Sequence, residues 1–186
     1  MKEFNDFLNE QTEKNTYNLD PEALTDEEKL FNRCKERSLY LIEQSEKTEG
    51  KLRELLKRSG KYPDDVIDRV VVFLKEYGYL DDLRYARQLI KYYKGQKSAK
   101  EIEQKLYTRK VDRNAIKTAM EEFKEDSDDA DSSELEAVQA LIQKKYGTVD
   151  PDALEPDAKR KMYASLMRKG FSYEMIKKAL EIEDVE

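Results

Sequence analysis

One apolar pattern occurs twice in this chain, sixty positions apart. KLYTRKVDRNAIKTAM at 105–120 and SLMRKGFSYEMIKKAL at 165–180 match at Leu106/Leu166, Val111/Phe171, Ile116/Ile176, Ala119/Ala179 and Met120/Leu180. A third copy, LLKRSGKYPDDVIDRVV, lies upstream if Lys61 is treated as an insertion. A period of this size is typical of small structural units in tandem, each too small to bury its apolar face alone.

Each copy contains three segments with helical periodicity. The first segments are 30–44, 84–93 and 135–146, and the second are 50–60, 99–110 and 156–170. The third segment of each copy follows a turn. In the first copy this segment contains Val66, Ile67, Val70, Val71 and Leu74, which share one helical face. The VVVF run has strand propensity, but the spacing of the whole segment favours a buried helix. The sequence therefore predicts an all-α fold of three tandem three-helix repeats forming an elongated, curved array.

Local signals predict where these helices begin and end. Thr25/Glu28, Ser98/Glu101 and Ser133/Glu136 have the spacing of a capping box, in which two side chains satisfy free amides of the first turn. Pro156 suits the first turn of a helix, and Gly60, Gly78 and Gly170 suit the left-handed residue that ends one.

Five segments follow from these boundaries. They are a weakly ordered acidic N-terminal tail (1–24), repeat 1 (25–79), a basic repeat 2 (80–124), an acidic linker (125–132) and repeat 3 (133–186). The joint EYGYLDD is short, so repeats 1 and 2 should be held closely. The stretch KEDSDDADSS is acidic and poor in apolar residues, which predicts a mobile hinge between repeats 2 and 3.

The charge of the chain is unevenly distributed. The net charge is −6, and residues 1–30 and 121–136 carry nine acidic groups each. Residues 84–113 instead hold ten basic groups against three acidic ones, an excess of seven positive charges. Such an uneven charge distribution bears on which partners the protein binds and not on how it folds.

Several classes of function are disfavoured. The chain has no His, which excludes the usual zinc sites and His-based catalysis, and its single cysteine, Cys34, excludes an internal disulfide and is interpreted as a small packing residue. DSDDADSSE lacks the glycine and the glutamate of a calcium loop and is interpreted as a solvated linker. No nucleophile motif or phosphate loop is present, so we expect no catalytic residue, cofactor or metal. Without a signal-peptide pattern or a long apolar run, we expect a cytoplasmic protein that does not contact membranes.

Basic residues recur along the first helix of repeat 2, opposite its apolar face. At an arbitrary helix this pattern indicates a solvated face, but the local charge excess leaves a partner-binding surface open as an alternative. Tyr92, Tyr93 and Tyr107 lie among these charges and could stack on bases, although Tyr93 falls on the apolar face and is expected to pack in the core. The candidate partner-binding residues are Arg84, Arg87, Lys91, Lys94, Lys97, Lys100, Arg109 and Lys110.

Three tandem three-helix units joined through GYLDDLRYARQLIKYYKG resemble the bacterial RecX family of recombination regulators. Gly78, Leu80, Asp81, Asp82, Tyr85 and Ala86 match its G-x-[LI]-[DN]-D-x-x-[YF]-A segment, and Ile102, Leu106 and Ile116 add support. So do the turns Arg58-Ser59-Gly60 and Lys169-Gly170-Phe171. The resemblance covers about residues 30–182. The chain departs from the family at Gln44 and Glu46, where Arg pairs are common, and at Lys110, where Gly is common.

The resemblance implies a non-enzymatic, monomeric regulator acting in DNA repair, recombination and the SOS response. Such a protein binds the RecA recombinase filament on single-stranded DNA and mainly inhibits its growth, ATP hydrolysis and strand exchange. Weak direct DNA contact by the basic repeat is compatible with this function. The alternative is a direct nucleic-acid-binding helical module, because three-helix units can place a helix in a groove of DNA. A pure structural scaffold is a third alternative.

Overall fold

The structure is a computed structural model that describes residues 24–125, 127–147 and 154–181, with backbone alone at 127–130 and 181. Within these ranges the chain forms helices and no strand, which confirms the all-α prediction. The helices are α2 (Asp26–Gln44), α3 (Glu49–Arg58), α4 (Asp64–Glu76), α5 (Asp82–Tyr93), α6 (Ala99–Thr108), α7 (Arg113–Glu125), α8 (Ser127–Tyr146), α9 (Pro156–Arg168) and α10 (Tyr173–Glu181).

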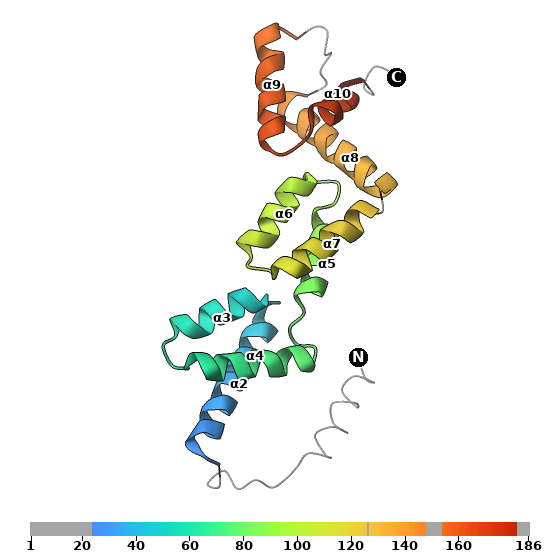
Figure 1. Cartoon of the computed structure of the whole chain (residues 1–186). Coiled ribbons are helices and arrows are strands. Elements are labelled where there is room, and N and C mark those ends of the chain that lie inside the picture. The colour runs from blue at the N-terminus through green and yellow to red at the C-terminus, as the bar shows by residue number, and fades with distance from the viewer. Residues whose placement is uncertain (1–23, 126, 148–153, 182–186) are drawn as a thin grey trace.

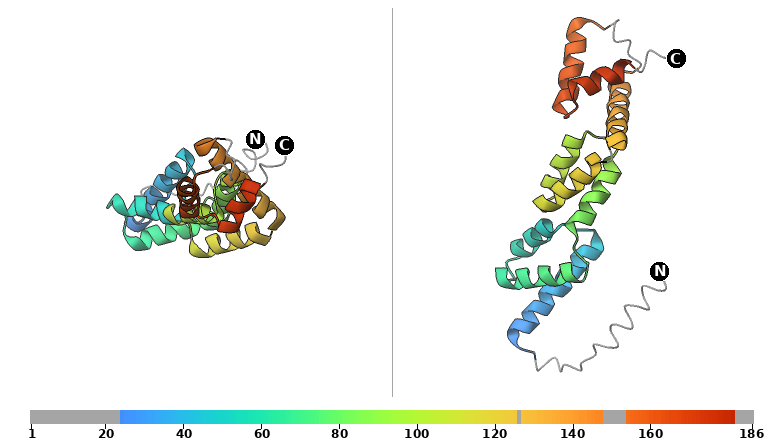
Figure 2. Two further views of the ribbon diagram at one scale, coloured as in Figure 1. Left: turned by 90° about the horizontal axis from the view of Figure 1, so that it is seen from above. Right: turned by 45° about the vertical axis from the view of Figure 1, so that its right-hand side comes forward.

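The helices stack in three groups, which we call unit 1 (α2–α4), unit 2 (α5–α7) and unit 3 (α8–α10). The groups follow one another along a single long axis, so the molecule is elongated (Figures 1 and 2). The second helices, α3, α6 and α9, all lie on the left-hand side of the stack in Figure 1. None of the helices in the described ranges is long and apolar enough to cross a membrane.

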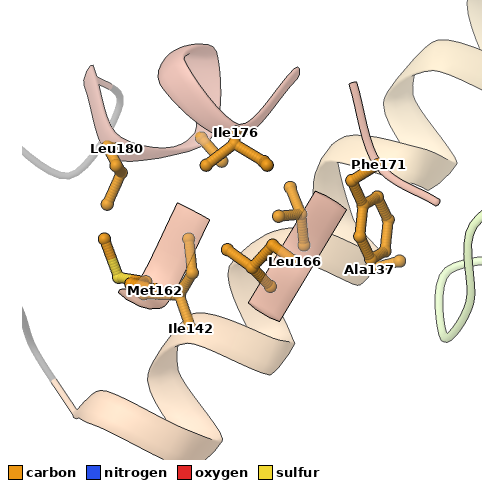
Figure 3. Close-up of a cluster of buried hydrophobic side chains, with 9 residues drawn as sticks. Ala137, Ile142, Met162, Leu166, Phe171, Ile176 and Leu180 are labelled. Carbon is orange, nitrogen blue, oxygen red and sulfur yellow. The ribbon is translucent and has the colours of Figure 1, made fainter. Parts of the chain in front are cut away.

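Each unit has its own hydrophobic core. Leu56 and Ile67 are buried in unit 1, Leu106 and Ile116 in unit 2, and Leu166 with its neighbours in unit 3, where α8, α9 and α10 enclose the cluster (Figure 3). The five pairs of residues that match across sixty positions are buried at all ten positions, which explains why the sequence repeats there. Cys34 is fully buried in unit 1, as predicted for a packing residue, and burial raises the pKa of its thiol.

Most of the predicted helix ends are confirmed. Thr25 and Glu28 form the capping box, Ser98 caps α6, and Pro156 occupies the first turn of α9. Gly60, Gly78 and Gly170 all have positive φ, and Lys110 takes the same left-handed conformation with φ of 57° although it carries a side chain.

The prediction for 125–132 was wrong in part. Helix α8 begins at Ser127, so most of the segment interpreted as a mobile, solvated linker is helical. Ser133 therefore lies inside α8 and does not cap it. Its hydroxyl instead accepts a hydrogen bond of 3.0 Å from the backbone amide of Gly95 in unit 2.

Candidate partner-binding surface

The surface of unit 2 is positioned by its contact with unit 1, which we call the first joint. Thr48 caps α3, and its hydroxyl accepts the amide of Lys51 at 3.1 Å. The same hydroxyl donates a hydrogen bond of 2.7 Å to the carbonyl of Arg109, at the end of α6. One side chain thus caps a helix in unit 1 and binds the helix end of unit 2.

Asp82, at the start of α5, strengthens the first joint. Its carboxylate accepts the amide of Glu49 in unit 1 at 2.8 Å and the amide of Asp112 in unit 2 at 2.6 Å. Burial raises the pKa of Asp82 above its ordinary value, although the two amides favour the charged form. Burial also disfavours the charge of Glu49, but hydrogen bonds from Lys75 and Arg53 outweigh it and lower the pKa of Glu49.

The contact between units 2 and 3, the second joint, repeats this arrangement. Ser98 caps α6 and accepts the amide of Glu101 at 3.1 Å, while its hydroxyl donates a hydrogen bond of 2.5 Å to the carbonyl of Lys169 at the end of α9. Glu134 accepts the amide of Ala99 at 2.6 Å, as Asp82 accepts that of Glu49. In both joints a carboxylate from the next unit binds the first amide of the preceding unit's second helix.

Both joints require a glycine where the backbones approach. A Cβ added at Gly50 would lie 2.5 Å from the carbonyl oxygen of Lys110, and one added at Gly170 would lie 2.8 Å from the Cβ of Lys100. With contacts this short, atoms of the neighbouring unit would have to shift. The close approach fixes how adjacent units sit.

The predicted binding residues lie along α5 and at both joints. Arg84, Arg109 and Lys110 lie at the first joint, where Arg84 is near Glu46 and Lys110 near Glu54. The remaining candidates lie along α5 or near the second joint, and they are Arg87, Lys91, Lys94, Lys97 and Lys100.

Much of the predicted positive charge is paired within the chain. Arg87 donates two hydrogen bonds to Glu122, at 2.8 and 2.6 Å, which raise the pKa of Arg87 and lower that of Glu122. Lys97 binds Glu101 at 2.7 Å, and Lys110 lies 3.3 Å from Glu54. These pairs are partly exposed, so a partner's carboxylates or phosphates could compete for the cations.

A groove of about 440 Å³ lies beside the first joint. Tyr85 and Tyr92 line it, and the Arg109 guanidinium donates a 2.5 Å hydrogen bond to the Tyr85 hydroxyl, which raises the pKa of Arg109. Tyr92 is 65% exposed and Tyr107 49%, whereas Tyr93 packs against the core of unit 2 as predicted. Tyr92 and Tyr107 are therefore accessible aromatic surfaces among basic residues.

Sequence reasoning missed a local cluster of lysines in unit 3. Lys144, Lys145 and Lys169 are exposed and line a common cleft between α8 and α9. The pairs Lys144-Lys145 and Arg168-Lys169 were visible in the sequence, but the acidic stretch before them dominated the charge pattern. No cluster of Asp, Glu or Cys in the described ranges is suited to hold a metal ion.

The fold and its joints define a class of helical repeat protein in which three small units share one docking geometry. The protein-family model described as RecX, third three-helix domain, matches residues 132–180 of the sequence. The regulatory protein RecX of Clostridium botulinum (strain Eklund 17B / Type B) is 30% identical over 148 residues, which are 78% of this chain and 66% of that protein. The regulatory protein RecX of Vibrio vulnificus is 29% identical over 81% of this chain and 92% of its own length.

A solved structure agrees with these sequence matches. The crystal structure of RecX from Lactobacillus salivarius superimposes with a TM-score of 0.67 over 85% of this chain and 99% of the other, at 18% identity, which supports the fold. The chain belongs to the RecX family. Its relatives carry the name of regulatory proteins, and it spans about two thirds of the clostridial ones.

Proposed function

We propose that this protein binds the RecA recombinase filament on single-stranded DNA and limits its growth, ATP hydrolysis and strand exchange, without catalysis of its own. It would act as a cytoplasmic monomer in DNA repair and recombination. The observation that carries the proposal is the match to regulatory proteins RecX, which extends over 78% of the chain in one relative and 81% in another. An elongated array with little core per unit suits contact with several subunits of a filament.

The surface that we assign to this contact is the α5 face of unit 2, which we define by Arg84, Arg87, Lys91 and Lys94. Lys91 is exposed next to Tyr92, and Arg87 is exposed despite its pairing with Glu122. A partner that supplies carboxylates or phosphates could replace Glu122 and engage Arg87. The contribution of this face to binding would therefore weaken as salt rises.

Equilibrium binding to assembled filaments and to bare DNA tests the proposal. The protein is labelled at its amino terminus and titrated with RecA filaments on single-stranded DNA, with free RecA and with the same DNA alone. We expect filament binding about a hundredfold tighter than binding to bare DNA, a gap of about 2.7 kcal/mol. Equal affinity for bare DNA would contradict the proposal.

Direct nucleic-acid binding is the second candidate function, favoured by the exposure of Tyr92 and Tyr107 beside lysines. Stacking of a base on such a ring contributes about 1–3 kcal/mol. The double substitution Tyr92→Ala/Tyr107→Ala would then reduce affinity for bare single-stranded DNA at least as strongly as affinity for the filament. A larger loss on the filament would argue against this alternative.

A further inference from the structure

A cleft of about 310 Å³ between α8 and α9 is separate from the surface assigned above. Its floor contains Leu166, which is buried, and Leu141, which is half-buried and packs against the core of unit 3. Lysines and one hydroxyl complete the lining, namely Lys144, Lys145, Lys169 and Ser165. Figure 3 shows Leu166 and the core side chains on which it rests.

All the charged residues that line the cleft are lysines. No carboxylate is among its lining residues, although the whole chain carries a net charge of −6. The Lys145 ammonium lies 3.0 Å from the hydroxyl of Ser165 and 5.0 Å from the ring centre of Tyr146, so this lysine is held in place by neutral groups. Its charge is not neutralised by these contacts, unlike that of Arg87.

The second joint fixes the cleft relative to unit 2. The carbonyl of Lys169 accepts the hydroxyl of Ser98, and the next residue, Gly170, lies against the Cβ of Lys100. Lys100 is exposed and therefore extends the basic surface from unit 3 onto α6. A ligand in the cleft would be held at a defined distance from the α5 face.

We propose that the α8–α9 cleft binds an acidic peptide segment of the partner protein, with one apolar side chain on the leucine floor and flanking carboxylates beside the lysines. The identity of the partner rests on the proposed function, whereas the acidic and apolar character of the peptide is inferred from the cleft itself. A peptide fits better than a nucleic acid because sugar and phosphate groups would leave Leu141 and Leu166 opposite polar atoms. The peptide carboxylates would supply counter-charges for the three lysines, since none of the ion pairs among the described residues involves them.

The experiment uses a fluorescein-labelled twelve-residue peptide in which Glu and Leu alternate, a matched peptide with Gln in place of Glu, and a bare oligo-dT. Each is titrated with the full chain and with Lys144→Gln/Lys145→Gln/Lys169→Gln. The control variant neutralises three exposed lysines outside the cleft, Lys61→Gln/Lys124→Gln/Lys178→Gln. RecA filaments are titrated with the same three proteins, and thermal melts confirm that all are folded.

We expect the cleft variant to lose about tenfold in affinity for the Glu/Leu peptide, corresponding to about 1.4 kcal/mol, while the control retains it. The Gln/Leu peptide should bind weakly to all three proteins. Equal binding of the Glu/Leu peptide by the wild type and the cleft variant would overturn the inference. So would a loss confined to oligo-dT, which would assign the cleft to nucleic acid.

The filament titration separates this inference from the proposed function. If the wild type binds the acidic peptide through the cleft but does not bind RecA filaments, the cleft stands and the proposed function fails. If filaments bind but the cleft variant binds them and the peptide as tightly as the wild type does, the proposed function stands and the cleft inference fails.

Discussion

The substitution Asp82→Asn should loosen the first joint. Asp82 accepts backbone amides with both carboxylate oxygens, that of Glu49 at 2.8 Å and that of Asp112 at 2.6 Å. An asparagine side chain offers one oxygen and one NH₂ group, so one backbone amide would face a donor. Leaving a partly buried donor unpaired costs about 1–3 kcal/mol. Removing a carboxylate that burial already disfavours recovers part of this loss, so we expect a net destabilisation of about 1–2 kcal/mol.

Thermal unfolding followed by circular dichroism measures this loss, and the midpoint should fall by about 2–8 °C for a chain of this size. Amide hydrogen exchange locates it, because Glu49 or Asp112 should exchange faster while the amides of unit 3 stay protected. The control is Glu121→Gln, which alters an exposed carboxylate 3.8 Å from Lys117. If Asp82→Asn unfolds at the same temperature as this control and both amides keep their protection, the reasoning about the joint is refuted.

Three further predictions concern the joints. Burial raises the pKa of Asp82 above 3.8, so its contribution to stability is greatest below that pH and falls as pH rises through the folded-state pKa. In urea titrations, Asp82→Asn should therefore lose more stability relative to the wild type near about pH 4 than near about pH 7. A larger loss at neutral pH would contradict this sign. Gly50→Ala should destabilise the protein by about 1–3 kcal/mol, because the added Cβ would lie 2.5 Å from the Lys110 carbonyl oxygen. An unchanged urea midpoint would show that the backbone at the first joint shifts to accommodate the methyl group without loss of stability. Lys110→Gly should stabilise by about 1 kcal/mol, since φ of 57° is strained for lysine, and a lower midpoint would show that its side-chain contacts matter more.

The repeat and its cores could be predicted because they depend on local spacing. Apolar residues such as Leu106 and Ile116 recur with the helical period, and helix ends such as Ser98 and Gly170 have short-range chemical signals. The start of α8 could not be read in this way. Ser133 and Glu136 have the spacing of a capping box, but such pairs also occur inside helices, and tertiary bonding of Ser133 to Gly95 decides its role.

The surface was harder to predict, because it depends on contacts between residues far apart in the chain. Thr48 reaches Arg109 across 61 positions and Ser98 reaches Lys169 across 71. Charge counting singled out the basic residues of unit 2 but could not show that Glu122 pairs with Arg87. The lysines of the α8–α9 cleft were overlooked for the same reason, since Lys169 joins Lys144 and Lys145 only when unit 3 folds.

Steady-state ATP hydrolysis by RecA on single-stranded DNA tests the central claim most directly. The protein is titrated in beside Arg84→Gln/Arg87→Gln/Lys91→Gln/Lys94→Gln and beside the control Lys61→Gln/Lys124→Gln/Lys178→Gln. We predict that the wild type and the control lower the rate of hydrolysis and that the α5 variant restores it. An unchanged rate with the wild type would contradict regulation of the filament, and equal inhibition by all three proteins would contradict the role of the α5 face.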